Sequence, residues 1–220
     1  MNINIDYVKV PLLFPTTDQT STVSSDIASM KNYGHVDLCI NVGPIGKAAA
    51  VTLEKSAAVA AASTALAFTK YYSSGIRLKY ITPSTDTPAA ADETVAGAGG
   101  AAATIYKDTG SELIMHSWDG DTFVTGETVT MSGGKTVVAD GIQIDEDIMV
   151  PRTAASNTFN LAAVASRQYI IPIDAADLGE GYDCIQVEIA DCDTATHLSI
   201  DAIFSKPRYG SEIPKTVLYD

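Results

Sequence analysis

Residues 35–43 read His-Val-Asp-Leu-Cys-Ile-Asn-Val-Gly, and this stretch decides the fold class. Its valine, leucine and isoleucine side chains recur at every second position, which is the period of a strand with one buried face. The same alternation returns late in the chain, where we predict four further strands. These strands span residues 157–161, 167–174, 182–190 and 196–204. The pattern therefore predicts an all-β protein.

The first strand leads into a second alternating segment. Gly43, Pro44 and Gly46 have turn chemistry, and residues 50–55 alternate again, so the two segments predict a β-hairpin. Ten alanines between positions 48 and 67 favour a helix at the same place. We expect the strand to continue to Ser56 and a short helical turn to follow it.

Breaker residues divide the chain into segments. Prolines interrupt the polar residues 1–34, which predicts an N-terminal arm, and the Pro- and Gly-rich stretch 80–100 predicts a loop and a boundary. The expected fold is a jelly-roll-like β-sandwich with a small inserted β subdomain and extended N- and C-terminal arms. The expected segments are the arm 1–34, the first part of the sandwich 35–95, inserted hairpins 103–150, the second part 155–205, and the arm 206–220.

Charge and composition exclude several classes of partner. Fourteen basic and 27 acidic residues give a net charge of −13 and a pI near 4.4, so nucleic acid and anionic membrane surfaces are not expected partners. The N-terminal residues have neither a basic start nor an apolar run, which predicts folding in a cytoplasm. Cys39, Cys184 and Cys192 lack metal-type spacing and are expected to be free thiols.

Candidate catalytic and metal-binding motifs are weak. His35, His116 and His197 are far apart in sequence, and the acidic pairs at 119–121, 145–147 and 191–193 do not continue into a calcium loop. Gly133-Gly134-Lys135-Thr136 lacks the leading glycine of a phosphate-binding loop and indicates a hairpin turn. We therefore expect no cofactor, no metal and no catalytic residue, and we predict that the protein is not an enzyme.

Two groups of stretches in the chain have marked patterns. The first group comprises Ser25 to Val36, the strand that follows, and Ala50 to Ser56; the second comprises Tyr169 to Asp174, Gly181 to Val187, and Ala202 to Tyr209. Together these stretches resemble a group of small virion proteins of tailed bacteriophages. The resemblance spans roughly residues 25–80 and 155–210 and omits the inserted block. It implies a capsid cement or head decoration subunit, assembled in the host cytoplasm and located on the exterior of the capsid. The implied partners are the major capsid protein and other copies of the chain in a closed oligomer, a trimer.

A cement protein gains affinity from several weak contacts that act together, and extended arms suit such contacts. The expected interaction residues of the arms are Ile3, Ile5, Val8, Leu12, Leu13, Phe14, Pro207, Arg208 and Tyr209. The alternative is that the arms pack on their own sandwich. Tyr106 and Trp118 in the insertion are candidates for ligand contact, which leaves open a fibre or glycan-binding module. Another tail or neck component is a further alternative, and a polysaccharide depolymerase is a third.

Overall fold

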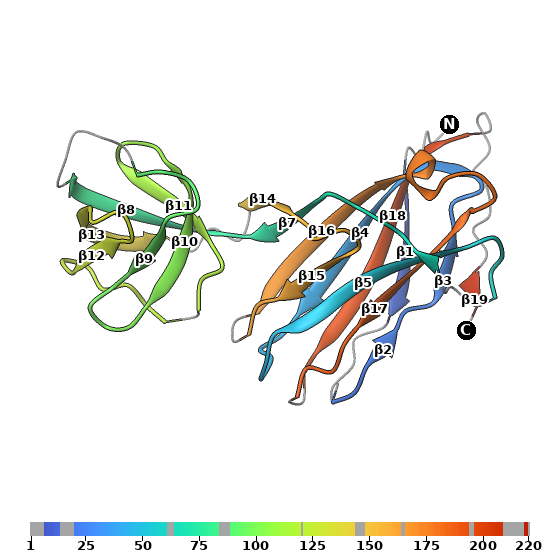
Figure 1. Cartoon of the computed structure of the whole chain (residues 1–220), viewed down its shortest axis with the longest axis horizontal. Helices are drawn as coiled ribbons and strands as arrows, with labels where there is room; N and C mark the ends of the chain where they lie inside the picture. Colours follow the sequence, from blue (N-terminus) through green and yellow to red (C-terminus); the bar gives the residue numbers. More distant parts are fainter. Residues whose placement is uncertain are drawn as a thin grey trace, which may run out of the picture. The chain divides into compact units, whose positions relative to one another are not determined.

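The computed structural model describes residues 7–13, 20–60, 64–83, 89–119, 121–143, 148–163, 166–193, 196–208 and 218–219. The chain divides into two compact units (Figure 1). The first unit comprises Met1–Tyr71 and Arg152–Asp220, and the second comprises Tyr72–Pro151. The regular secondary structure of the described residues consists of β-strands, apart from one 3₁₀ turn, η1 (Ala175–Leu178).

The first unit is a sandwich of two antiparallel sheets. The six-stranded sheet has the order β1 (Tyr7–Leu13), β18 (Leu198–Pro207), β4 (Tyr33–Val42), β16 (Arg167–Asp174), β7 (Lys70–Ser74) and β14 (Met149–Thr153). The main path of the seven-stranded sheet is β15 (Thr158–Leu161), β5 (Ala49–Ser56), β17 (Cys184–Ile189), β3 (Ile27–Ser29) and β19 (Leu218–Tyr219). Two short strands complete it, β2 (Val23–Ser24) on β17 and β6 (Thr64–Ala65) on β5.

The strand order is that of a jelly roll. Four strands of one sheet are arranged β1-β18-β4-β16, and four strands of the other are arranged β15-β5-β17-β3. Along the chain these eight strands alternate between the sheets, except that β5 and β15 are neighbours in the same sheet. This is the two-Greek-key connectivity of an eight-stranded jelly roll. The second unit is inserted between β5 and β15.

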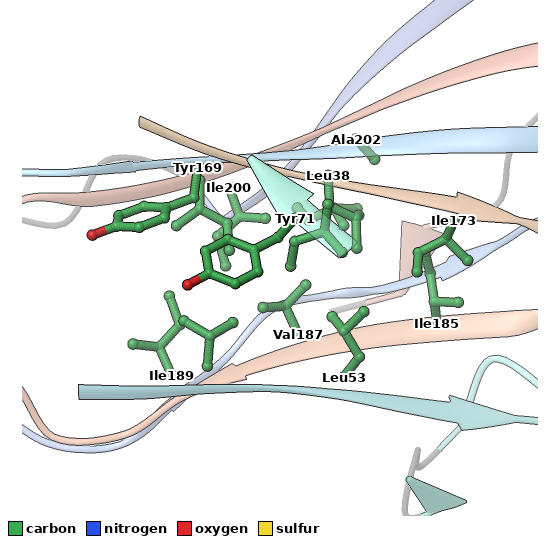
Figure 2. Close-up of a cluster of buried hydrophobic side chains, with 14 of the residues drawn as sticks. Leu38, Leu53, Tyr71, Tyr169, Ile173, Ile185, Val187, Ile189, Ile200 and Ala202 are labelled. Atoms are coloured by element: carbon green, nitrogen blue, oxygen red, sulfur yellow. The ribbon is translucent and has the colours of Figure 1, made fainter. Parts of the chain in front are cut away.

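The core of the sandwich is formed by side chains that point inward from both sheets. Figure 2 shows Leu38, Tyr169 and Ile200 facing Leu53 and Val187 across the interior. Each of these five side chains is at least 97% buried, as the alternation in the sequence requires. The alternation of apolar residues therefore accounts both for the strands and for the buried core between the two sheets.

The second unit is a closed antiparallel barrel with the strand order β10-β11-β8-β13-β12-β9. Its strands are β8 (Ile76–Pro83), β9 (Thr94–Ala96), β10 (Ala102–Asp108), β11 (Glu112–His116), β12 (Thr128–Met131) and β13 (Thr136–Gln143). Inward-pointing residues such as Leu78, Ile105, Leu113 and Val129 have no exposed surface and fill the interior. The barrel therefore has a core of its own.

The expectation of an all-β, jelly-roll-like sandwich is confirmed. The predicted hairpin between residues 35–43 and 50–55 is wrong, because β4 pairs with β16 and β18 while β5 lies in the opposite sheet. Both strands point their apolar residues into the same core, so the turn between them crosses from one sheet to the other. The expected helical turn after Ser56 is also absent from residues 57–60, which are bends.

The segment boundaries also differ from those expected. The described residues of the predicted arm 1–34 include β1, β2 and β3, all strands of the sandwich, and residues 218–219 of the second arm form β19. The first part of the sandwich ends near Tyr71, and the inserted unit begins at Tyr72 instead of 103. It includes β8 and β9 because Ile76, Leu78 and Tyr80 alternate with lysine and arginine and supply one wall of the barrel.

Candidate functional site

The apolar residues predicted as contacts of the N-terminal arm lie in strand β1. Leu12 is 1% exposed within the sandwich core, and Val8 and Leu13 are half-buried against it. The register aligns Val8 with Phe204 of β18, so these side chains share the inner face of the sheet. The alternative that the arms pack on their own sandwich therefore describes these three residues. Ile3, Ile5 and Phe14 lie outside the described residues, as does Tyr209.

Pro207 and Arg208 at the end of β18 are exposed. Pro207 pairs with Tyr33 of β4, and the backbone amide of Arg208 donates a 2.9 Å hydrogen bond to the carbonyl oxygen of Asn32. The backbone here is therefore fixed to the start of β4, while both side chains are free to meet solvent or another molecule.

The two aromatic candidates in the barrel have different environments. Tyr106 is the extra residue of a β-bulge, between Ile105 paired with Met115 and Lys107 paired with Ile114, and it is 38% exposed. The Trp118 ring packs against the barrel core, and its indole N–H donates to the carbonyl oxygen of Asp121. Trp118 therefore holds its own loop in place, and Tyr106 is the more accessible of the two.

A polar cluster that the sequence analysis missed lies where β4, β16 and β18 meet. Nδ1 of His35 is 2.8 Å from Oδ1 of Asp174, and Nε2 is 3.3 Å from Oδ1 of Asp37. Nζ of Lys206 donates to the same Asp174 oxygen at 3.2 Å. His35, Asp174 and Lys206 are far apart in sequence, and the strand register, which aligns His35 with Asp174 and Ser205, brings them together.

The cluster joins three strands electrostatically. The hydrogen bond with His35, and then the one from Lys206, hold the pKa of Asp174 below its usual range, so its carboxylate is charged at neutral pH. The side chains of Asp37, Asp174 and Lys206 are at least 40% exposed, and such surface pairs contribute little to stability. The arrangement is therefore best described as a positioned set of charges on the surface of the sheet.

The acidic pairs considered as cation ligands have partners within the chain. Nζ of Lys47 is 2.8 Å from Asp191 and 3.8 Å from Asp193. Asp119 accepts hydrogen bonds from the backbone amides of Ala102 at 2.8 Å and Asp121 at 3.0 Å. The group at 145–147 lies outside the described residues. Within the described part of the chain, no three His, Cys, Asp or Glu side chains are grouped so that they could hold a metal ion.

The three cysteines are free and buried. Burial, and then the charges of Asp37 and Asp201, raise the pKa of the Cys39 thiol to about 11. Burial, and then a hydrogen bond with the Asp183 carboxylate, raise the pKa of Cys184 to about 12. Burial also raises the pKa of Cys192. A thiolate nucleophile requires a lowered pKa, so these positions are unsuited to that role.

Comparisons with known proteins identify no relative. No family model matches the chain, and neither the curated proteins nor the solved structures contain a match. In the described residues, no helix has the length and apolar character needed to cross a membrane. The proposals below therefore depend on the sequence resemblance, the topology and the surfaces described above.

Proposed function

We propose that this protein is a non-enzymatic structural component of a tailed-phage particle, a cement or decoration subunit that binds the outer surface of the head and stabilises it. One observation carries the proposal. The stretches that resemble phage virion proteins coincide with β3, β4, β5, β16, β17 and β18, six of the eight jelly-roll strands. The stretches that carry the resemblance thus all lie in the sandwich, although the resemblance as a whole, roughly residues 25–80 and 155–210, also reaches the first strand of the inserted unit.

The topology agrees with this role at the level of fold. Jelly rolls are common in viral capsid proteins, although lectins and other proteins share them, so the fold by itself does not identify a function. A cement subunit needs a rigid body that keeps its contact surfaces in place, and the filled core between the two sheets supports such rigidity. The partner on the particle is the major capsid protein.

The net charge of −13 suits the exterior of the capsid, because a strongly acidic surface opposes clumping of particles and does not compete for packaged DNA. The subunit is synthesised in the host cytoplasm and acts on the particle as a closed homo-oligomer. Neither nucleic acid nor a membrane is a proposed partner.

The decisive experiment compares purified particles with and without the protein. We expect the protein to be present in many copies per particle, and we expect particles lacking it to lose DNA at a lower temperature. Adding the purified protein back should restore the heat resistance. The proposal fails if the protein is absent from particles, or if depleted particles are equally stable. A low copy number would instead favour a tail or neck component.

A fibre or glycan-binding role is the second candidate, because Tyr106 is exposed at a bulge of the barrel. Exposed aromatic rings stack on sugars, and a bulge is a common way of directing a side chain outward. This candidate predicts binding on a glycan array that is lost in Tyr106→Ala. Absence of glycan binding by the full chain would exclude this role for the glycans tested.

A further inference from the structure

The two outward faces of the sandwich differ in chemistry. Outward positions on β15, β5 and β17 are mostly small or polar and carry two carboxylates, Glu54 and Glu188, with no lysine or arginine. The name six-stranded face is used here for the outward surface of β1, β18, β4 and β16, which are four neighbouring strands of the six-stranded sheet. It combines half-buried apolar side chains with charges of both signs.

The strand register places the apolar side chains of this face close together. One row across the sheet aligns Asp201, Cys39 and Ile170, and the adjacent row aligns Ile203, Asp37 and Pro172. Pro11 of β1 continues the first row beside Asp201. Ile170, Pro172, Ile203 and Pro11 are each half-buried, so they present apolar surface between charged neighbours. Interfaces between proteins also combine apolar and polar surface and are overall about as apolar as the rest of a protein's surface.

The charges on this face are partly offset, because two lysines, Lys9 and Lys206, lie among three aspartates, Asp37, Asp174 and Asp201. Lys9 lies 3.0 Å from Asp201, and Asp174 is contacted by both His35 and Lys206. Two copies of a chain with a net charge of −13 repel each other, and contact through the acidic seven-stranded surface would increase that repulsion. On the six-stranded face lysines offset aspartates, so contact through this face adds less electrostatic repulsion than contact through the seven-stranded surface. It also offers charges of both signs, which can pair with opposite charges on an identical face.

We propose that the six-stranded face binds the same face of a second copy of this chain. The two copies are related by a two-fold axis, so that each face contributes the same residues. The inference deepens the proposed function by assigning the surface through which copies associate. It differs from the trimer expected from the sequence, because a face-to-face contact between identical surfaces closes with two copies.

The dimensions of the face determine how much surface the contact can bury. Neighbouring strands are about 4.8 Å apart and residues rise about 3.4 Å each, so four strands with eight residues apiece cover about 500 Å² per copy. A pair would bury about 1,000 Å², which is at the lower limit of specific interfaces. We therefore expect a reversible dimer with a dissociation constant in the micromolar range.

Sedimentation velocity of the purified full chain, from about 1 to 200 μM, tests this inference. We expect wild type to shift from monomer to dimer with concentration, and Ile170→Asp to weaken association at least tenfold. Thr52→Asp adds the same charge on the opposite surface and should dimerise as wild type does. Lys9→Glu changes a side chain that is 59% exposed, so it should keep the fold and still weaken the dimer.

Circular dichroism establishes that the sandwich of each variant is folded, and the fluorescence of Trp118 shows that the barrel is unchanged. A monomer at every concentration overturns the inference, as does a trimer, or a dimer that neither Ile170→Asp nor Lys9→Glu weakens. None of these results affects the measurement of binding to particles, which tests the proposed function separately. Failure of the dimer and failure of the cement role can therefore be distinguished.

Discussion

The rings of Tyr71 and Phe159 stack in the sandwich core, with centroids 4.0 Å apart and planes 16° from parallel. Phe159 also contacts Phe68 edge-on and Tyr169 at 5.4 Å, so one side chain joins three aromatic neighbours. Phe159→Ala should lower the free energy of unfolding of the sandwich by about 3–5 kcal/mol, because it removes these contacts and leaves a cavity.

Urea denaturation followed by circular dichroism measures this loss. Asn160→Ala is the matched control, since Asn160 is the next residue on the same strand but is exposed, and its effect should be within about 0.5 kcal/mol. Trp118 is the single tryptophan and lies in the barrel, so its fluorescence reports the other unit. Equal losses for the two variants would contradict the assignment of Phe159 to the core.

Gly75, which precedes β8, lies where a side chain has no room. A Cβ atom built there would be 2.7 Å from the carbonyl oxygen of Met115 and 2.5 Å from Cγ2 of Val150. Because one of these neighbours is a backbone atom, Gly75→Ala must shift a strand of the barrel. We expect this variant to lower the free energy of unfolding of the barrel by about 1–3 kcal/mol. Gly99→Ala is the control, since nothing lies within 4 Å of its Cβ position. A denaturation midpoint for Gly75→Ala equal to that of Gly99→Ala would show that the strand yields freely.

Alternation in the sequence predicted strands well because it reflects burial. Residues 167–174 were predicted as a strand and form β16 with the same bounds, since Tyr169, Ile171 and Ile173 all enter the core. Alternation identifies the buried face of a strand but not its neighbour. The segments that form β4 and β5 share a core from opposite sheets, and no local signal distinguishes this arrangement from a hairpin.

The surface features could not be predicted without knowing how the strands pair. His35 and Asp174 are separated by 139 positions, and only the pairing of β4 with β16 makes them neighbours. The row of Cys39, Ile170 and Asp201 on the six-stranded face likewise combines residues from three strands. Each strand alone presents one of its members.

The thiols should be unreactive in the folded protein. Burial raises the pKa of Cys39 to about 11 and of Cys184 to about 12, so the reactive thiolate is scarce at pH 8. We expect negligible labelling by a disulfide reagent in buffer and three thiols per chain in denaturant. The intact mass of unreduced protein should show no loss of hydrogens. Rapid labelling of one native thiol would indicate that the strand carrying it opens readily.

Asp108 should make the stability of the barrel depend on pH in acid. Its carboxylate accepts hydrogen bonds from the Tyr80 hydroxyl at 2.7 Å and from the amides of Ala89 and Gly110 at 2.8 Å each. Burial alone would raise the pKa of Asp108, but these three hydrogen bonds outweigh burial and lower it. The carboxylate therefore stabilises the fold fully above the unfolded-state pKa of about 3.9, and this contribution is lost as pH falls through the lower folded-state value.

Urea titrations followed by Trp118 fluorescence between pH 7 and pH 3 measure this dependence. Asp108→Asn should destabilise the barrel by about 1–3 kcal/mol at pH 7, because its amide group places a donor where a backbone amide or the hydroxyl also donates. The difference between wild type and Asp108→Asn should shrink below about pH 4, where the carboxylate of the unfolded wild-type chain begins to gain its proton while that of the folded chain is still charged. Tyr80→Phe removes one of the three donors, so it should raise the folded-state pKa of Asp108 towards the unfolded-state value and reduce the stability that is lost between about pH 4 and pH 3. A difference that stays constant from pH 7 to pH 3 would show that the carboxylate charge has no part in holding Ala89 and Gly110 to β10.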